Sequence, residues 1–197
     1  MFEVRLHGRG GQGVVTGAAL LSLAAFRAGL RAQAFPSFGS ERMGAPVVSY
    51  CRIARGEIRS REPVVAPDAV IVQDPTLLHS VDVFGGLDQG GYVIVNSRRS
   101  PEELGLFALE RKLPSGHVQC VPATEIALEH LGRPIPNAVL LGAFAALTGV
   151  VDIESLVAAI GDHFPPALAS RNSAAARAAR GHIIAPVNQG ERHAQTD

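Results

Sequence analysis

The sequence predicts an α/β fold, a Rossmann-like open and mostly parallel sheet with helices on both faces and a small antiparallel insertion. The chain opens with a strand, a glycine-rich loop, a helix and a second strand, the order that begins a right-handed parallel crossover. Two nearly uninterrupted apolar runs, "PDAVIVQD" and "QGGYVIVNS", are typical of strands covered on both faces. With 197 residues, 47% of them hydrophobic, we expect one domain over residues 1–185 and a polar tail over 186–197.

The first half supplies the opening unit and the insertion. "FEVRLHG" alternates as a strand does, and the stretch from Val14 to Ala28 is rich in alanine and leucine and ends at Gly29, a favoured helix C-cap. "LRAQAF" predicts the second strand, which Pro36 ends. "VVSYCRIA" and "GEIRS", joined through Arg55 and Gly56, predict a hairpin-like antiparallel pair.

The second half continues the sheet and ends in helices. The predicted strands are 67–74, 89–97 and 117–123, and the predicted helices are 76–83, 124–131, 137–148, 153–164 and 168–180. Asn137 and Asp152 stand where N-cap residues belong, because their side-chain oxygens can accept hydrogen bonds from the first free N–H groups of a helix.

Composition limits the function classes. Eighteen basic residues balance eighteen acidic ones, so no overall field favours nucleic acid or a membrane surface as a partner. Residues 1–61 hold nine arginines against three glutamates, which is either a solvated face or an anion- or partner-binding face. Cys51 and Cys120 are far apart and form no CxxC motif, so we expect buried free thiols. Without a signal-like start, we expect a cytoplasmic location.

The loop "HGRGGQG" matches G-x-G-x-x-G through Gly8, Gly10 and Gly13 and lies between a strand and a helix. Glycines permit close backbone approach, and a helix N-terminus offers unpaired N–H groups to a phosphate. An NAD site also needs an acidic residue after the second strand, and none precedes Glu41; no Walker A lysine follows. The loop is therefore a packing turn or a site for a phosphate ligand other than NAD, with Arg9 as an anion contact.

Other candidate chemistry is sparse. The seven histidines show no metal-ligand spacing, and no G-x-S-x-G elbow is present. Asp74 and Asn96 follow neighbouring buried strands at the carboxyl edge of the sheet, where open α/β sheets place their ligands. Each is either a binding residue or a cap within a loop.

Two stretches together carry a resemblance to a known family. "GRGGQGVVTGAALLSLAA" followed by "FPSFGSERMGAPVVSYCRI" resembles the gamma subunit of the 2-oxoacid:ferredoxin oxidoreductases. The similarity continues through "PDAVIVQDPTLL", "GGYVIVNS" and "PNAVLLGAFAALTG", and it ends near Asn172. It covers about residues 3–182, nearly the whole chain.

The resemblance implies an enzyme that decarboxylates a 2-oxoacid on thiamine diphosphate, passes electrons through iron–sulfur clusters to ferredoxin or a similar acceptor, and releases an acyl-CoA. The gamma chain is then a module that packs against the thiamine-binding parts and takes part in binding coenzyme A. We expect it to bind no cofactor alone and to be inactive alone. Thiamine diphosphate, magnesium and the clusters would lie on alpha, beta and delta (ferredoxin-like) subunits, with a flavin subunit as an optional addition.

The resemblance also assigns roles. It makes candidates for the coenzyme A phosphates or for a subunit contact of Gly8, Gly10, Gly11, Gln12 and Gly13. Arg9, beside the loop, and Asn96, at the carboxyl edge of the sheet, join these candidates from their positions. The candidates for an interface or a channel mouth are Ser37, Phe38, Gly39, Glu41, Arg42, Met43 and Asn137. Glu41 and Arg42 equally suit an internal brace. Met43 stands where many relatives have arginine or glycine, which suits a bulkier or aromatic oxoacid.

Three alternatives stay open. One is a stand-alone NAD- or flavin-binding Rossmann oxidoreductase. Another is the gamma subunit of an aryl glyoxylate (phenylglyoxylate-type) dehydrogenase complex that passes electrons to NAD. The third is a structural interface protein with no ligand.

Overall fold

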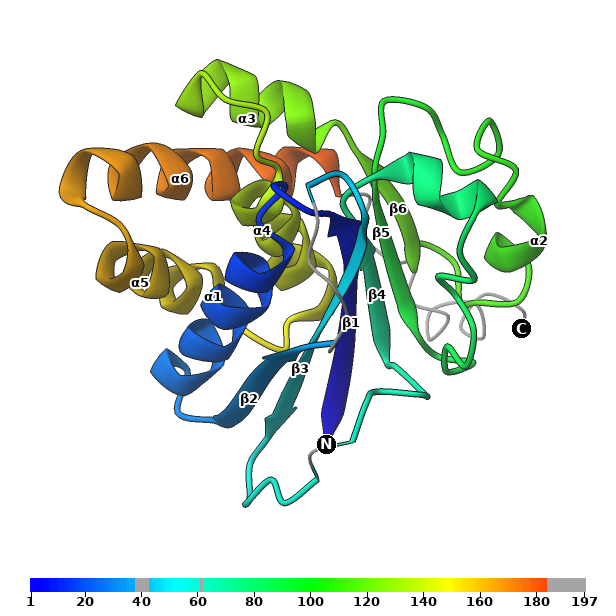
Figure 1. The fold of residues 1–197 in the computed structure, drawn as a ribbon, viewed down its shortest axis with the longest axis horizontal. Helices are drawn as coiled ribbons and strands as arrows, with labels where there is room; N and C mark the ends of the chain where they lie inside the picture. Colours follow the sequence, from blue (N-terminus) through cyan, green and yellow to red (C-terminus); the bar gives the residue numbers. More distant parts are fainter. Residues whose placement is uncertain (38–42, 61, 184–197) are drawn as a thin grey trace, which may run out of the picture.

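The chain folds around one six-stranded sheet whose order is β2-β3-β1-β4-β5-β6, seen in Figure 1. The structure is a computed structural model that describes residues 1–37, 43–60 and 62–183. The strands are β1 (Phe2–Arg9), β2 (Arg31–Pro36), β3 (Pro46–Ala54), β4 (Ala69–Val72), β5 (Tyr92–Asn96) and β6 (Val118–Val121). β1, β4, β5 and β6 run parallel, whereas β3 is antiparallel to both β1 and β2. The predicted fold class is therefore confirmed.

The antiparallel insertion is built differently from the predicted hairpin. β3 pairs with β1 on one side and β2 on the other, with Ser49 opposite Leu6 and Cys51 opposite Ala34. The segment 56–60 forms no strand, so the predicted second half of the hairpin is wrong. The reason is that β3 is buried along most of its length and needs a partner on each edge, while Glu57 and Arg59 remain exposed and pair with each other.

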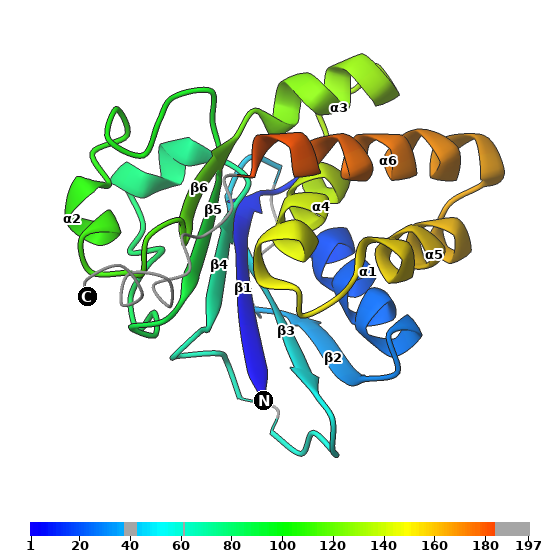
Figure 2. The same ribbon diagram turned by 180° about the vertical axis from the view of Figure 1, so that it is seen from behind.

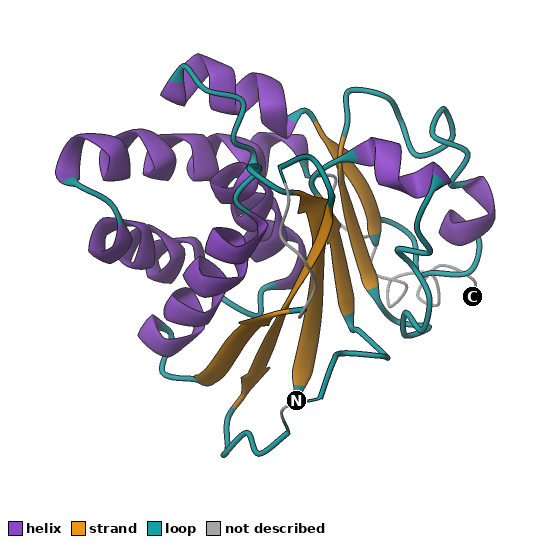
Figure 3. Cartoon of the chain, in the orientation of Figure 1, coloured by secondary structure: helices purple, strands orange, loops and turns teal. Residues whose placement is uncertain are grey.

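The helices cover the two sheet faces unequally, as Figures 1 and 2 show. They are α1 (Val14–Arg27), α2 (Phe107–Glu110), α3 (Ala123–Leu131), α4 (Asn137–Thr148), α5 (Ile153–His163) and α6 (Pro166–Ala178), with 3-10 turns η1 (Pro75–His79) and η2 (Ala179–His182). The five longer helices pack on one face, and α2, η1 and loops cover the other face over β4, β5 and β6, a division visible in Figure 3. The sequence did not predict α2, and the short helix predicted over 76–83 is the 3-10 turn η1.

Helix α4 lies at the centre of the helical layer. Its sequence "NAVLLGAFAALT" is apolar all round, which is typical of a helix buried on every side, and Leu140 and Phe144 are completely buried. It approaches α6 so closely that a Cβ atom on Gly142 would lie 2.0 Å from the carbonyl oxygen of Ala176. The packing of α4 and α6 fixes where α4 begins, and that start lies beside the glycine loop.

The two predicted N-caps have different outcomes. Asp152 caps α5, with its carboxylate accepting a 2.7 Å hydrogen bond from the Ser155 N–H group. Asn137 is instead the first residue of α4, and Pro136 occupies the N-cap position, so that prediction is wrong by one residue. The Asn137 side chain instead donates a hydrogen bond to the Gly13 carbonyl, just before α1, as described below. None of the helices in the described ranges is long and apolar enough to cross a bilayer.

Candidate functional site

The glycine loop joins the end of β1 to the start of α1 in a tight turn that leaves no room for a side chain at Gly8 or Gly13. A Cβ atom on Gly8 would lie 2.6 Å from Cγ2 of Val14, closer than real Cβ atoms approach. Gly13 precedes α1 with φ +76°, in the left-handed region that favours glycine. A Cβ atom there would also lie 2.7 Å from Nδ2 of Asn137. Gly13 is thus favoured by its backbone conformation, and Gly8 by the close approach of neighbouring side chains.

The structure brings the glycine loop and the second signature loop together. The Gly10 N–H group donates to the Ala45 carbonyl at 2.9 Å, and the Gly44 N–H group donates back to the Gly10 carbonyl at 3.1 Å. The Met43 side chain lies over Gly11, since a Cβ atom on Gly11 would be 3.0 Å from Cε of Met43. Met43 is 86% exposed, so its apolar side chain projects into solvent beside the loop.

The other candidates on the second loop are only partly placed. Ser37 is exposed just after β2, and its N–H group donates to the Val48 carbonyl at 2.8 Å. Phe38, Gly39, Glu41 and Arg42 lie outside the described residues.

Polar side chains tie the loop to the end of β4. Arg9 forms an ion pair with Asp74, with 3.2 Å between Nε and Oδ2, and it also donates to Thr76 Oγ1 and to the Gly44 carbonyl. Gln12 accepts the Arg9 N–H through Oε1 and donates through Nε2 to Asp74 at 3.0 Å. Partial burial acts to raise the pKa of Asp74, but hydrogen bonds from Thr76 and Gln12 and the charge of Arg9 lower it overall. The Arg9 guanidinium is therefore engaged within the fold, which weakens the expectation that it contacts an anion.

The backbone at the start of α1 is the part of the loop that remains open to a ligand. The N–H groups of Gly11, Gly13 and Val14 have no hydrogen-bond acceptor among the described residues. They lie at the positive end of the α1 dipole, an arrangement that suits a phosphate. β3 also separates β2 from β1, so the end of β2 is not beside the loop as an NAD site requires.

Asn96 serves the framework of the sheet. Its Nδ2 group donates to the Gln73 carbonyl and to Thr124 Oγ1, both at 2.8 Å, and its Oδ1 atom accepts the Thr124 N–H group at 3.1 Å. These bonds tie the ends of β4 and β5 to the start of α3. The structure does not bring the Asn96 side chain together with the glycine loop.

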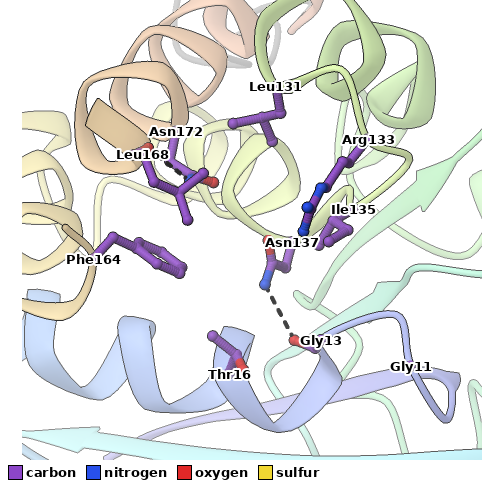
Figure 4. A pocket seen from close by; sticks show the side chains of 10 residues that line it. All are labelled: Gly11, Gly13, Thr16, Leu131, Arg133, Ile135, Asn137, Phe164, Leu168 and Asn172. Carbon is purple, nitrogen blue, oxygen red and sulfur yellow. Dashed lines mark hydrogen bonds between the residues drawn. The ribbon is translucent and has the colours of Figure 1, made fainter. Parts of the chain in front are cut away.

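Asn137 links the glycine loop to the helical layer. Its Nδ2 group donates to the Gly13 carbonyl at 3.3 Å, and its Oδ1 atom accepts the Ala138 N–H group at 2.7 Å. Beside this contact lies a pocket of about 170 Å³, shown in Figure 4. Its lining residues are Gly11, Gly13, Thr16, Leu131, Arg133, Ile135, Asn137, Phe164, Leu168 and Asn172.

Most of these lining residues were not predicted. The resemblance placed Asn137 and Asn172, but Arg133 and Phe164 come from turns between helices and Leu168 from the first turn of α6, and no spacing in the sequence indicates that these three converge. Only the packing of α4 against α6 and of α5 against α1 brings these turns to the start of α1.

Burial shifts the pKa of one histidine and of both cysteines. Burial, with repulsion from Arg5, lowers the pKa of His7 to about 4 despite the opposing charge of Asp82. Burial raises the pKa of Cys51 to about 12 and, with help from Glu110, that of Cys120 to about 12. Both cysteines are free thiols as predicted, although Cys120 is only partly buried. Within the described ranges, no three His, Cys, Asp or Glu residues are grouped so that they could hold a metal ion.

Comparison with known proteins gives a consistent family assignment. Residues 3–181 match the model of the family described as "Pyruvate ferredoxin/flavodoxin oxidoreductase". The common gamma subunit of the pyruvate/ketoisovalerate oxidoreductases of Thermococcus kodakarensis is 50% identical over 179 residues, which span 91% of this chain and 95% of that protein.

Solved structures agree. The crystal structure of the pyruvate oxidoreductase subunit PORC of Thermotoga maritima has a TM-score of 0.77 and 36% identity, over 93% of this chain and 97% of that one. The 2-oxoglutarate:ferredoxin oxidoreductase of Magnetococcus marinus, solved with 2-oxoglutarate, coenzyme A and succinyl-CoA, has a TM-score of 0.69. It covers 94% of this chain and 33% of that one, and at 17% identity this likeness shows the fold alone.

Proposed function

This chain belongs to the pyruvate ferredoxin/flavodoxin oxidoreductase family, and we propose that it is the gamma subunit of a complex that oxidatively decarboxylates a 2-oxoacid to acyl-CoA and CO2. The observation that carries this proposal is 50% identity to a pyruvate/ketoisovalerate gamma subunit over 179 residues, and the family match over residues 3–181 includes both signature loops. Electrons pass to ferredoxin or a similar acceptor. The substrate class is a short 2-oxoacid such as pyruvate or 2-oxoisovalerate.

The alternatives are not favoured. An NAD-binding Rossmann enzyme needs β2 beside β1 with an acidic residue at its end, and here β3 lies between them. An aryl glyoxylate substrate rests only on Met43, and the relatives are named for pyruvate and ketoisovalerate.

The redox and thiamine chemistry belongs to partner subunits in this proposal. An iron–sulfur cluster usually takes four cysteine ligands, and this chain has two, one on β3 and one on β6. Alpha, beta and ferredoxin-like delta subunits therefore carry thiamine diphosphate, magnesium and the clusters, and a flavin subunit is optional. The complex works in the cytoplasm, which suits the two free thiols.

The glycine loop is the proposed contact for coenzyme A. The unpaired N–H groups of Gly11, Gly13 and Val14 and the positive end of α1 suit its phosphates, whereas Gly8 and Gln12 shape the loop. The exposed Met43 beside the loop faces a partner subunit, where an apolar side chain gains from burial. Asn96 and Arg9 act indirectly, by fixing the ends of the strands beneath the loop.

Co-expression of the chain with its neighbouring genes tests the assembly. An affinity-tagged chain should co-purify with thiamine- and cluster-bearing subunits, and the complex should reduce a viologen dye with pyruvate or 2-oxoisovalerate only when coenzyme A is present. Phenylglyoxylate should be a poor substrate. Activity of the isolated chain, or a tagged chain that purifies without partners, would contradict the proposal.

A charge placed at the start of α1 tests the loop. Val15 is 39% exposed in the first turn of α1, where an aspartate suits the helix dipole but repels a bound phosphate. Val15→Asp should raise the KM for coenzyme A about tenfold with little change in the KM for the 2-oxoacid. Val15→Asn, of similar size and uncharged, is the matched control and should change the KM by less than about threefold.

A further inference from the structure

Strand β2 forms a free edge of the sheet. It pairs with β3 on one side and with no described residue on the other. The Ser37 N–H group donates to the Val48 carbonyl at 2.8 Å, which fixes the residues of β2 that bond to β3. Because alternate residues of an antiparallel strand turn their backbone groups to opposite sides, Ala32 and Ala34 turn theirs away from β3. Their N–H and C=O groups are therefore available to another strand.

This edge lacks the usual protection against pairing. Natural edge strands are blocked by a charged side chain, a proline or a bulge. From Ala32 to Ala34 the strand has none of these, since its register with β3 is uninterrupted and Arg31 and Pro36 stand only at its ends. The side chains of both alanines lie on the helical face and are single methyl groups, so a second chain can approach closely.

An uncharged stripe on α1 lies next to this edge. Its members share one side of the helix, and they are Val15, Ala19, Ser22 and Phe26. Gly17, on the opposite side, faces α4, since a Cβ atom there would lie 3.7 Å from Cβ of Asn137. The stripe therefore faces away from α4, toward the β2 end of the sheet, where Figures 1 and 2 both show α1. Phe26 is 66% exposed, so this side of α1 gains from burial.

The β2 edge fits a copy of itself turned about a two-fold axis through Gln33. In that arrangement Ala32 of one copy is opposite Ala34 of the other, and each N–H group meets a carbonyl group. Arg31 lies opposite Phe35 of the second copy, where its guanidinium can pack against the ring. Like charges are not opposed, because Arg31 and its symmetry mate are about 13 Å apart along the strands.

The stripe on α1 has the same symmetry. Val15 and Phe26 are equally far from the middle of the stripe, and so are Ala19 and Ser22. Two antiparallel copies of α1 thus place Phe26 of one against Val15 of the other. The small side chains of Ala19 and Ser22 meet between these contacts and let the two helices approach.

One axis serves both elements. The short turn 28–30 joins the end of α1 to the start of β2. From this turn, the middle of the stripe is about 10 Å along α1, and Gln33 is about 7 Å along β2. Because α1 packs over both β2 and β3, its axis lies about 5 Å, one strand spacing, from the two-fold axis. The two α1 helices are then about 10 Å apart, a distance at which helices pack.

We propose that two copies of this chain associate through their β2 strands, which pair antiparallel about Gln33 and join the two sheets into one. The paired α1 helices cover the junction and bury Phe26. The partner is a second copy because the edge and the uncharged stripe are each complementary to themselves. The inference goes beyond the proposed function and requires no ligand. A complex built on this contact holds the chain twice.

A disulfide tests the axis directly. Gln33 and its symmetry mate form a non-hydrogen-bonded pair with Cα atoms about 4.5 Å apart, within the range that a disulfide spans. On mild oxidation, the full-length Gln33→Cys variant should give a band of twice the chain mass on a non-reducing gel. Arg31→Cys is the matched control on the same strand, because its two sulfur atoms are too far apart to join. The wild type should give no such band, since Cys51 is buried and Cys120 is on β6.

A charge on the stripe tests the helix contact. Phe26→Glu buries a carboxylate without a partner, so it should raise the dissociation constant of the paired chains at least about tenfold. Sedimentation velocity of the full-length chain over a dilution series measures this constant. Phe107→Glu is the matched control, because Phe107 is 55% exposed on α2, on the other face of the sheet. It should leave the dissociation constant unchanged.

Three results would overturn the proposal. One is a wild-type chain that sediments as a monomer at every concentration. Another is a Gln33→Cys variant that forms no disulfide, or forms it no faster than Arg31→Cys. The third is a Phe26→Glu variant that pairs as the wild type does. If Phe26→Glu instead releases a thiamine- or cluster-bearing subunit from the co-expressed complex, this surface receives that subunit and the second copy is excluded. None of these results affects the proposed function, which is tested by co-purification and coenzyme A dependence.

Discussion

Arg9 and Asp74 face each other across the carboxyl ends of β1 and β4, with 3.2 Å between Nε and Oδ2. Asp74 also accepts hydrogen bonds from Gln12 and from both the N–H group and the hydroxyl of Thr76. The pair therefore fixes the glycine loop against the sheet. It also occupies the space at the end of β4 where a Rossmann enzyme would place its cofactor.

Replacing Asp74 with asparagine should lower the free energy of unfolding at pH 7 by about 1 kcal/mol, because the ion pair is partly exposed. The pKa of Asp74 is lowered in the folded state, so its contribution exists above its ordinary value of 3.8 and is lost as the pH falls through the folded value. Urea unfolding should therefore show the largest gap between wild type and Asp74→Asn above pH 4. Asp162→Asn breaks an exposed pair with Arg27 and should cost less; equal losses would contradict this.

His7 should give a separate pH dependence at higher pH. Its folded pKa is about 4 against an ordinary 6.5, so the unfolded chain takes up a proton first as the pH falls. Stability should fall between pH 6.5 and pH 4 by up to about 3 kcal/mol from this residue alone, and no further below pH 4. Urea unfolding of His7→Gln should lack this fall, whereas His79→Gln, at an exposed site, should follow the wild type. Parallel profiles for His7→Gln and wild type would contradict the assignment.

The contact of α4 with α6 should tolerate no added atom. Gly142→Ala puts a Cβ atom 2.0 Å from the Ala176 carbonyl oxygen, so the helices must separate at a cost of about 2 kcal/mol or more. Gly161→Ala, in α5 with no atom within 4 Å of the new Cβ, should stabilise by up to about 1 kcal/mol. Thermal melts compare the two variants directly. A neutral Gly142→Ala would show that the helices are not packed this closely.

Alanine variants of two glycines with similar positive φ values distinguish the cost of backbone strain from the cost of a steric clash. Gly29→Ala, at φ +79° with open space around it, should cost only backbone strain of about 1 kcal/mol. Gly13→Ala has φ +76° and also meets Nδ2 of Asn137 at 2.7 Å, so it should cost about 1 to 2 kcal/mol more. Chemical denaturation of both variants measures the difference. Equal losses would mean that the Asn137 contact adjusts without cost.

The fold was predictable where the apolar pattern is continuous. "AVIV" and "YVIVN" are buried strands as expected, and the helices beginning near Val14 and Ile153 start and end within a residue of their predicted bounds. The strand predicted over 56–60 is absent for a physical reason. A strand followed by a turn favours a local hairpin, but β3 pairs instead with β1 and β2 on its two edges. The local sequence does not reveal these two distant partners.

The site was predictable only in its backbone. The glycine spacing indicated the turn at the start of α1, whereas the resemblance gave Met43 and Asn137 only as interface or channel candidates and did not indicate that they lie beside this turn. The engagement of Arg9 by Asp74 was not visible, because 65 residues separate them in the chain. Asn96 stands at the expected edge of the sheet, yet its hydrogen bonds to Gln73 and Thr124 turn it toward the framework.

The antiparallel placement of β3 also affects how the chain folds. Because β3 runs opposite to β1, it begins at the edge of the sheet where β1 ends, and its pairing of Arg9 with Pro46 delivers Gly44 to Gly10. Such pairing joins segments distant in sequence, and long-range pairing is slow to form. The two loops that identify the family therefore meet only where β3 has paired with β1, so a site that needs both loops depends on closure of the middle of the sheet.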